Sequence, residues 1–305
     1  MSKTALILGA AGQDGFYLEK LLTEAGVEVS CAARARRGYL PCDVGDFDQV
    51  LGLVKTLRPH YLFHLAAVSS ADHSALFPNE RAIVDGTVHV LEAVRQSAPL
   101  CRVFIAGSAL QFKNGGSAID ENSSLSFSSA YAAQRNASVF MARYFRERFR
   151  LPVFIGYFFH HDSPRRSSHH MAQKIATAAQ NVSLGLDAKL EVEDWNFKKE
   201  WTFAGDAMEA VWTIVNQKTH NEIVIGSGMP YSIQEWAQEC FAQVGKNYLN
   251  YITSRRNGPS ETVTCNPSLL RSCGWTPRVS FSELASMMVT SDLVLGAPAL
   301  SEEKI

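Results

Sequence analysis

Three side chains in the sequence could carry acid–base chemistry: Ser108, Tyr131 and Arg135. Tyr131 and Arg135 are four residues apart, so on a helix they share one face and can interact. A tyrosine hydroxyl beside a cation can exchange a proton with a substrate hydroxyl, while a serine hydroxyl hydrogen-bonds the reacting oxygen. A tyrosine and an arginine at this spacing also form ordinary pairs on helix surfaces. The interpretation as a site therefore depends on the rest of the chain.

A glycine-rich turn follows the first apolar run. The run Thr4–Leu8 is followed by Gly9, Gly12 and Gly15, and then by the helix-like segment Phe16–Leu22. In such a strand–turn–helix, one glycine permits a sharp turn, another lets the backbone approach a pyrophosphate and a third lets helix and strand pack closely. An ordinary tight turn is the alternative. The framing by a strand and an amphipathic helix favours a dinucleotide-binding site.

Basic residues follow the second predicted strand, Val27–Ala33, at positions Arg34, Arg36 and Arg37. An acidic residue at this point binds the adenosine ribose of NAD, whereas an arginine suits the 2′-phosphate of NADP. A solvated basic loop would have the same composition. The arginines favour NADP as the cofactor, with NAD as a possibility.

The other expected cofactor contacts lie near the carboxyl ends of predicted strands. Asp43 and Val44 could reach the adenine, and residues 64–68 would line the nicotinamide side. The full set of expected contacts is Gly9, Gly12, Gln13, Asp14, Gly15, Arg34, Arg36, Asp43, Val44, Leu65, Ala66, Ala67, Tyr131 and Arg135.

Hydrophobic patterning predicts the scaffold that must position these residues. Short apolar runs alternate with helical patterns through the first half of the chain, which indicates βαβ units. We expect an α/β fold: a Rossmann-type doubly wound parallel sheet with a smaller C-terminal α/β substrate lobe. Residues 1–160 would form the dinucleotide-binding domain, with core strands continuing later, and residues 161–305 mainly the lobe. The expected strands are Thr4–Leu8, Val27–Ala33, Tyr61–Ala66, Arg102–Ala106 and Pro152–Tyr157, and the expected helices are Phe47–Leu57, Ile83–Gln96, Ala132–Phe149, Ser232–Val244 and Ser282–Val294.

Composition excludes several classes of function. The 305 residues are 46% hydrophobic and 19% charged with a net charge of -1, which gives no electrostatic basis for binding nucleic acid or an anionic membrane. No apolar run approaches the roughly 20 residues of a membrane helix, and the chain begins with a strand, so no signal peptide is expected. The six cysteines lack CxxC spacing, which suits reduced thiols. We expect a soluble cytoplasmic enzyme.

The motifs as a set resemble a known family. Ser108, Tyr131 and Arg135 resemble the Ser/Thr–Tyr–Lys triad of the extended short-chain dehydrogenase/reductases, with arginine in the place of lysine. Within that group the chain resembles the GDP-mannose 4,6-dehydratases over nearly its whole length, most clearly at residues 12–18, 159–166 and 266–277. The resemblance implies binding of NADP and a GDP-sugar. It also implies oxidation at sugar C4, loss of water across C5–C6 and return of the hydride to C6.

The chain departs from that family at positions that matter for elimination. Ser108 takes the place of the family's catalytic threonine, and Leu110 stands where the family has the glutamate that removes the C5 proton. Neither leucine nor the neighbouring Ala109 can remove a proton. Arg135 keeps the charge of the family's lysine but has a wider, planar head. The loop at residues 36–41 is shorter than the arginine-containing loop that family members use in tetramer contacts.

The resemblance also assigns residues to the sugar nucleotide, with cations and an aromatic ring to meet the diphosphate and the base. No metal is expected, although His160–His161 and His169–His170 are adjacent pairs. Neighbouring residues alternate faces in an extended chain, and no carboxylate cluster completes a ligand set. The expected substrate contacts are His160, Arg165, Lys174, Lys199, Trp201 and Arg256.

The sequence therefore predicts an NADP-dependent oxidoreductase or epimerase that acts at C4 of a nucleotide sugar, expected to be GDP-linked. Tyr131 would move the hydroxyl proton, Ser108 would hydrogen-bond the oxygen, and Arg135 would hold the nicotinamide ribose. Two alternatives stay open. One is a true 4,6-dehydratase whose base lies elsewhere, and the other is a weakly catalytic NADP-binding sensor or scaffold.

Assembly is predicted from the helix that carries Tyr131. Its other face has Val139, Met141 and Tyr144, which are apolar enough to pair with a second helix. The resemblance implies dimers formed through such a four-helix arrangement, and the shortened loop argues against the family's tetramer. We expect a homodimer.

Overall fold

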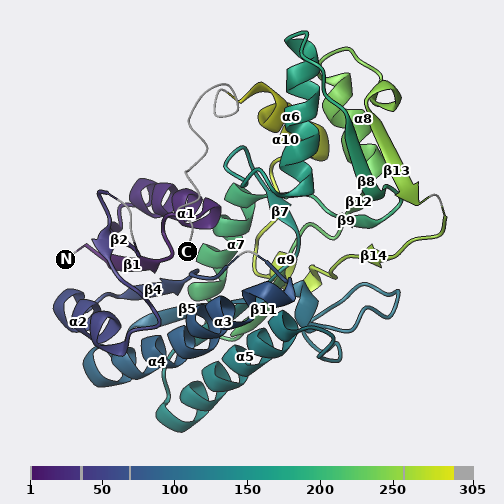
Figure 1. The fold of residues 1–305 in the computed structure, drawn as a ribbon. Coiled ribbons are helices and arrows are strands. Elements are labelled where there is room, and N and C mark those ends of the chain that lie inside the picture. Colours follow the sequence, from purple (N-terminus) through teal and green to yellow (C-terminus); the bar gives the residue numbers. More distant parts are fainter. Residues whose placement is uncertain (1, 35–36, 69, 257, 292–305) are drawn as a thin grey trace.

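The computed structural model describes residues 2–34, 37–68, 70–256 and 258–291. At its centre lies a seven-stranded sheet in which all neighbouring strands are parallel (Figure 1). Its strands are β1 (Thr4–Leu8), β2 (Glu28–Ala33), β3 (Leu40–Pro41), β4 (Tyr61–His64), β5 (Arg102–Ser108), β6 (Val153–Phe158) and β11 (Glu222–Ile225). The order β11-β6-β5-β4-β1-β2-β3 places β1 in the interior, with the chain winding outward from it in both directions. This is a Rossmann-like doubly wound sheet, as predicted, and such sheets bind ligands at the carboxyl ends of their strands.

Helices cover both faces of the sheet (Figure 1). Successive strand side chains point to opposite faces, so Leu6 and Leu8 of β1 join one core while Ala5 and Ile7 join the other. The first core also contains residues of α2 (Phe47–Leu57), α4 (Gly86–Ser97) and α5 (Ala130–Phe149), and the second contains residues of α1 (Gln13–Glu24) and α7 (Ala204–Val215).

A third core lies outside the sheet and is built from residues 171–289. It surrounds Trp236, which is fully buried and stacks on Trp201 with ring centroids 4.4 Å apart. Its helices are α6 (Met171–Ser183), α8 (Ile233–Ala242) and α10 (Phe281–Thr290). Short strands flank it and connect it to the large sheet: β7 (His161–Asp162), β8 (Leu190–Asp194), β9 (Lys198–Glu200), β10 (Thr202–Phe203), β12 (Pro230–Ser232), β13 (Ile252–Arg256) and β14 (Thr262–Val263).

Several predicted boundaries are wrong. The strand expected to reach Ala66 ends at His64, and the backbone of Ala66 packs closely against Gly9. The helix expected from Ile83 begins at Gly86 and follows a π-helix, Glu80–Asp85. A Cβ on Gly86 would lie 3.1 Å from the His64 ring, so glycine lets the helix approach the end of the sheet. The last two predicted helices are shorter, as α8 and α10, and residues 292–294 lie outside the described part of the chain.

The apolar face proposed for dimer formation also needs correction. Val139 is 1% exposed and packs inside the first core, so its side chain is not free to meet a second subunit, and the partly buried Met141 packs against the same core. The exposed apolar residues of α5 are Phe140 and Tyr144, at 48% and 50%. They are four residues apart and share one helix face. The homodimer stays a prediction, now based on this pair.

The cysteines give no sign of cross-linking. All six thiols are free, and all but Cys273 are buried. Burial raises the pKa of the Cys31 thiol to about 12, which makes it a poor nucleophile. No helix among the described residues is both long enough and apolar enough to cross a membrane.

An ion cluster at the edge of the sheet joins α5, β6 and β11. The carboxylate of Glu222 accepts hydrogen bonds from Arg143 Nη2 (2.6 Å), from Arg146 and from the Tyr157 hydroxyl (2.8 Å). Burial alone would raise the pKa of Glu222, but these three donors lower it to about 2. The cluster therefore holds the edge strand β11 against the rest of the sheet.

We expect Glu222→Gln to destabilise the protein by roughly 1–3 kcal/mol, because two partly buried guanidinium groups lose their anionic partner. The folded-state pKa lies below the unfolded value of about 4.3, so the stabilisation is complete above that pH and is lost as pH falls toward about 2. Urea unfolding of both proteins at near-neutral pH and near pH 3.5 measures this. Glu147→Gln, at an exposed position of the same helix, is the control, and equal midpoints for all three proteins at neutral pH would contradict the assignment.

Candidate functional site

The glycine turn has the geometry that a dinucleotide requires. Gly9 has φ +84°, and a Cβ there would lie 2.6 Å from the backbone nitrogen of Ala66. A Cβ on Gly15 would lie 2.5 Å from Ala10 Cα, so this glycine lets α1 pack against the turn. Gly12 is exposed, and a Cβ there would meet only the Gly9 carbonyl at 3.5 Å. Gly12 is also the N-cap of α1, so a phosphate can approach the free amides of the helix start.

The residues predicted for the adenosine side lie at the ends of β2 and β3. Arg34 is exposed directly after β2, and Arg36 lies outside the described residues. Asp43 accepts hydrogen bonds from Arg81 at 3.0 and 3.2 Å. Burial alone would raise the pKa of Asp43, but its hydrogen bonds and the Arg81 charge lower it. Val44 is 5% exposed and belongs to the core, so its side chain packs inside rather than facing a ligand.

Leu65, Ala66 and Ala67 follow β4 at the same edge of the sheet. The Leu65 amide donates to the Leu8 carbonyl at 3.0 Å, which holds this segment beside the glycine turn. Ala67 is exposed there. The preceding His64 is buried, and burial lowers its pKa to about 4, so it is neutral at physiological pH.

The predicted Tyr131–Arg135 pair is in contact. Arg135 Nε donates to the Tyr131 hydroxyl at 3.1 Å, and its Nη1 donates to the Ala106 carbonyl at 2.6 Å. Arg135 is 8% exposed, whereas Tyr131 is partly exposed one turn earlier on α5. The arginine therefore ties the helix to β5 and places a permanent positive charge against the phenolic oxygen.

Ser108 ends β5 opposite Phe158 of β6, and a buried amide network fixes it. Gln111 Oε1 accepts from the Ser108 amide at 2.7 Å, and Gln111 Nε2 donates to Asn136 Oδ1 on α5 at 3.0 Å. Gln111 and Asn136 are 0% and 1% exposed. Sequence reasoning missed both residues. The sequence offers one indication for each: Gln111 is a polar residue three positions after Ser108, and Asn136 is a polar residue next to Arg135.

Leu110 lies in the 3₁₀ turn Ala109–Gln111 that follows Ser108. Its side chain is 48% exposed, while Ala109 is 9% exposed. Gln111 is occupied by the amide network, so no residue of this turn offers a free basic group. The turn presents an apolar side chain beside the serine.

Four side chains meet beyond β6 in a group that we call the cation cluster. Its members are His160, Asp162, Arg166 and Lys199. Lys199 Nζ lies 2.6 Å from His160 Nε2, which in turn lies 2.9 Å from Asp162 Oδ2. Arg166 Nε lies 3.3 Å from Asp162 Oδ1. Lys199 and Asp162 are 8% and 0% exposed. Asp162 and Arg166 were not predicted, although both lie within the segment 159–166 that carries the family resemblance.

Burial and mutual charge set the protonation of this cluster. Burial, with the Lys199 charge, lowers the pKa of His160 to about 4, so its ring is neutral near neutral pH. Burial lowers the pKa of Lys199 to about 8. Burial would raise the pKa of Asp162, but His160, Lys199 and Arg166 together hold it well below its usual value. The cluster therefore carries net positive charge near neutral pH.

Three other residues predicted to bind substrate, Trp201, Lys174 and Arg256, do not add a free group to the cation cluster. Trp201 is 4% exposed, with Trp236 stacked on its ring and Lys199 Nζ 4.3 Å from its centroid. Its ring therefore packs in the third core and positions Lys199, instead of offering a free face. Lys174 is exposed on α6, and Arg256 is exposed at the end of β13, 3.7 Å from Glu193. These two lie outside the cation cluster.

His160 and His161 take separate partners, whereas the rings of His169 and His170 contact each other, with centroids 4.2 Å apart. His160 faces Lys199, whereas His161 Nε2 lies 3.0 Å from Asp14 Oδ1. His170 contacts Arg166 at 3.1 Å. Within the described ranges, no group of three or more His, Cys, Asp or Glu side chains could hold a metal ion.

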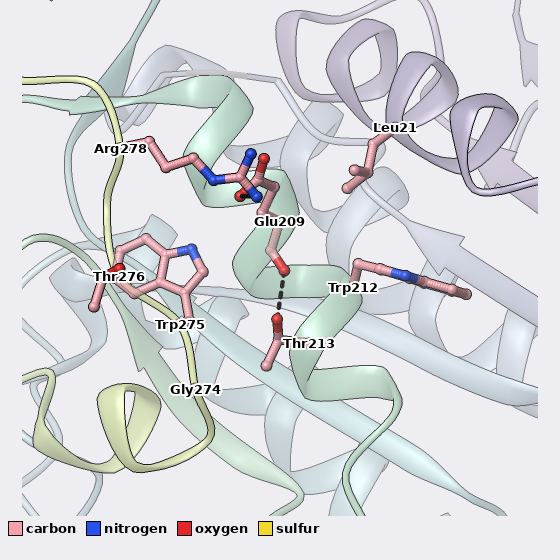
Figure 2. Close-up of a pocket in the computed structure, with 8 residues that line it drawn as sticks. All are labelled: Leu21, Glu209, Trp212, Thr213, Gly274, Trp275, Thr276 and Arg278. Atoms are coloured by element: carbon pink, nitrogen blue, oxygen red, sulfur yellow. Dashed lines mark hydrogen bonds and ion pairs between the residues drawn. The ribbon is translucent and has the colours of Figure 1, made fainter.

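A recess of about 230 Å³ lies between α1, α7 and residues 274–278 (Figure 2). Leu21 and Trp212 lie on one side and Trp275 on the other, and Arg278 pairs with Glu209 at 2.9 Å. None of the residues predicted to bind cofactor or substrate lines it. The recess is distinct from the site at the carboxyl ends of the strands.

Comparison with known proteins agrees with this arrangement. The family model for GDP-mannose 4,6 dehydratase matches residues 6–288. GDP-mannose 4,6 dehydratase 1 of Arabidopsis thaliana is 28% identical, over 96% of this chain and 90% of its own length. The human GDP-mannose 4,6 dehydratase is 26% identical, over 95% of this chain and 91% of its own.

Solved structures share the fold. A putative epimerase from Burkholderia cenocepacia superposes with a TM-score of 0.85 at 20% identity, covering 97% of this chain and 99% of that one. RMD from Pseudomonas aeruginosa complexed with NADPH gives 0.83 at 18% identity, covering 97% and 98%. The family match, the paired tyrosine and arginine, and the glycine turn all agree. The chain belongs to the GDP-mannose 4,6-dehydratase family, a family of enzymes within the extended short-chain dehydrogenase/reductases.

Proposed function

We propose that the protein is a nicotinamide-dependent nucleotide-sugar oxidoreductase or epimerase that acts at sugar C4 without removing water. The observation that carries the proposal is the contact of Arg135 with the Tyr131 hydroxyl beside a turn that has Leu110 and no free base. Redox at C4 needs a proton carrier and a hydrogen-bond donor for the oxygen, and both are present. Elimination needs in addition a base at C5, and the turn supplies none.

Each residue has one task in this proposal. Tyr131 takes the proton of the C4 hydroxyl or returns it, and Arg135 stabilises the negative charge that develops on the phenolic oxygen. Ser108 hydrogen-bonds the C4 oxygen from the end of β5. Bound dinucleotide supplies the hydride acceptor or donor.

The substrate class is supported by the cation cluster and by the relatives. Lys199 and Arg166 provide positive charge for a diphosphate, and His160 orients Lys199. The relatives' names refer to GDP-mannose, whereas a structural neighbour is described in complex with UDP-glucose and NAD. The family membership favours a GDP-sugar.

A first test is hydride exchange at C4 without dehydration. With GDP-mannose and oxidised cofactor, mass spectrometry is expected to show loss of two hydrogens for net oxidation, or an isomer of unchanged mass for epimerisation, and in neither case loss of water. Tyr131→Phe should abolish the exchange because no proton carrier is left, whereas Arg135→Lys should alter its rate and keep it, since the charge survives. Formation of a 4-keto-6-deoxy product at an ordinary enzymatic rate would contradict the proposal and favour the dehydratase alternative. Cofactor binding without any exchange across GDP-, UDP- and CDP-sugars would favour a sensor or scaffold.

Cofactor choice is a second test. Several solved neighbours are described with NAD and one with NADPH, while the exposed Arg34 after β2 favours the 2′-phosphate. We expect tighter binding of NADP(H) than NAD(H) in a titration, and we expect Arg34→Asp to reverse the order. Lys55→Asp, at an exposed position on α2, controls for a general change of charge. If the protein bound both cofactors with equal affinity and Arg34→Asp left both affinities unchanged, Arg34 would not determine the choice of cofactor.

A third test uses the pKa of Lys199, which burial lowers to about 8. The ammonium form attracts a diphosphate, so affinity for GDP-mannose should be constant below that pKa and should fall as pH rises through it. In Lys199→Arg the charge persists at all accessible pH values, so the fall should disappear even if the overall affinity changes. Calorimetric titration from about pH 6.5 to about pH 9 measures both profiles. The same fall in the arginine variant would show that another group titrates.

A further inference from the structure

Two polar contacts tie the glycine turn to the segment after β6. Ser163 Oγ donates to Gln13 Oε1 at 2.7 Å. His161 Nε2 lies 3.0 Å from Asp14 Oδ1. Gln13 and Asp14 are the first two residues of α1 and directly follow the Gly12 N-cap, so they adjoin the amides that would meet a phosphate.

Apolar and aromatic contacts reinforce this connection. The Arg165 guanidinium lies 3.9 Å from the centroid of the Phe16 ring, over its face. Tyr17 meets Phe203 edge to face at 5.0 Å, and Phe203 belongs to β10, which pairs with β7. Three side chains of the first turns of α1, those of Gln13, Asp14 and Phe16, therefore contact residues 161–165, here called the β7 segment, and Tyr17 contacts the strand β10 that pairs with β7.

The opposite side of the same segment holds the cation cluster. Side chains alternate along an extended chain, so His161 and Ser163 face α1 while His160 and Asp162 face Lys199. Ser163 and Asp162 are both buried, so neither contact can move without disturbing the other. One short stretch of backbone thus joins the phosphate-binding turn to the charges proposed to bind substrate.

The contact between Asp14 and His161 is a charged one, at the helix start where a pyrophosphate would lie. Asp14 adds negative charge there, and His161 offsets it. Burial alone would lower the pKa of His161, but the Asp14 carboxylate raises it. The same contact lowers the pKa of Asp14 against the effect of burial. Both directions agree with an ion pair between these two side chains.

We propose that Gln13 and Asp14 are positioning residues that couple dinucleotide binding to nucleotide-sugar binding through Ser163 and His161. This inference rests on the proposed function, because it assigns a link between the two binding sites of that function. Dinucleotide on the turn fixes Gln13 and Asp14, these fix the β7 segment, and the segment fixes His160 and with it Lys199. By linkage, the sugar nucleotide tightens dinucleotide binding by the same factor.

The test is the affinity for GDP-mannose, measured by calorimetry with and without saturating NADP⁺ at one pH. In the wild-type protein we expect roughly tenfold tighter binding with NADP⁺, within the usual range of coupling between sites. Ser163→Ala and Asp14→Asn should each bring this ratio toward one, while GDP-mannose still binds each variant alone. Glu24→Gln, at an exposed position of α1, should leave the ratio unchanged.

A purely local role for these residues predicts a different result. If Gln13 and Asp14 only contacted the dinucleotide, their variants would weaken NADP⁺ binding and leave the ratio intact. A double-mutant cycle of Gln13→Ala with Ser163→Ala should show non-additive effects on the affinity ratio. The reason is that each change removes the same hydrogen bond, the one between Ser163 and Gln13. The inference would be wrong if NADP⁺ left the affinity of the wild-type protein for GDP-mannose unchanged. It would also be wrong if Ser163→Ala and Asp14→Asn left the affinity ratio at its wild-type value. Absence of binding by either ligand would instead overturn the proposed function, and the inference with it.

Discussion

The buried guanidinium of Arg135 is the interaction on which the arrangement of β5 and α5 around the proposed site depends. A buried charge is unfavourable unless hydrogen bonds compensate it, and this one donates to the Ala106 carbonyl and the Tyr131 hydroxyl. No carboxylate forms an ion pair with it among the described residues. A neutral phenol compensates the charge only in part, so negative charge on the Tyr131 oxygen improves the pairing. The fold thus holds a cation against the phenol that is proposed to accept a proton.

A second set of bonds keeps Ser108 in register with that pair. Ser108 lies on β5 and Tyr131 on α5, so nothing local fixes the distance between them. Arg135 anchors the helix to the last part of β5, and the Gln111–Asn136 amide pair anchors it to the turn beyond Ser108. With both bonds in place, α5 can neither slide nor rotate without breaking a buried hydrogen bond. Such fixation is what preorganised catalysis requires.

The sequence predicted the parts of the structure that local patterns determine. Glycines between a predicted strand and a predicted helix are enough to predict a tight turn that can meet a phosphate. The four-residue spacing of Tyr131 and Arg135 is enough to predict their contact. Trp201 shows the limit. An indole beside a lysine fits base stacking equally well, and only the fold shows that Trp236, from a helix 35 residues later, occupies its face. Val139 was assigned to the wrong face of α5 for the same reason, because an apolar helix residue does not reveal which neighbour it meets.

Leu110 and Arg135, the two positions at which the sequence predicts a departure from the family, bear on different halves of the proposed chemistry. Removing a proton from C5 needs a group with a lone pair at that carbon. Arginine has none to offer, leucine has none, and the Gln111 oxygen is occupied by the Ser108 amide. Transfer of a proton at C4 needs only the phenol and a cation that stays charged, and arginine keeps its charge more firmly than lysine does. In the proposed reaction, Leu110 leaves no base at C5 and Arg135 keeps the charge that Tyr131 needs, so the two residues together favour redox at C4 over elimination.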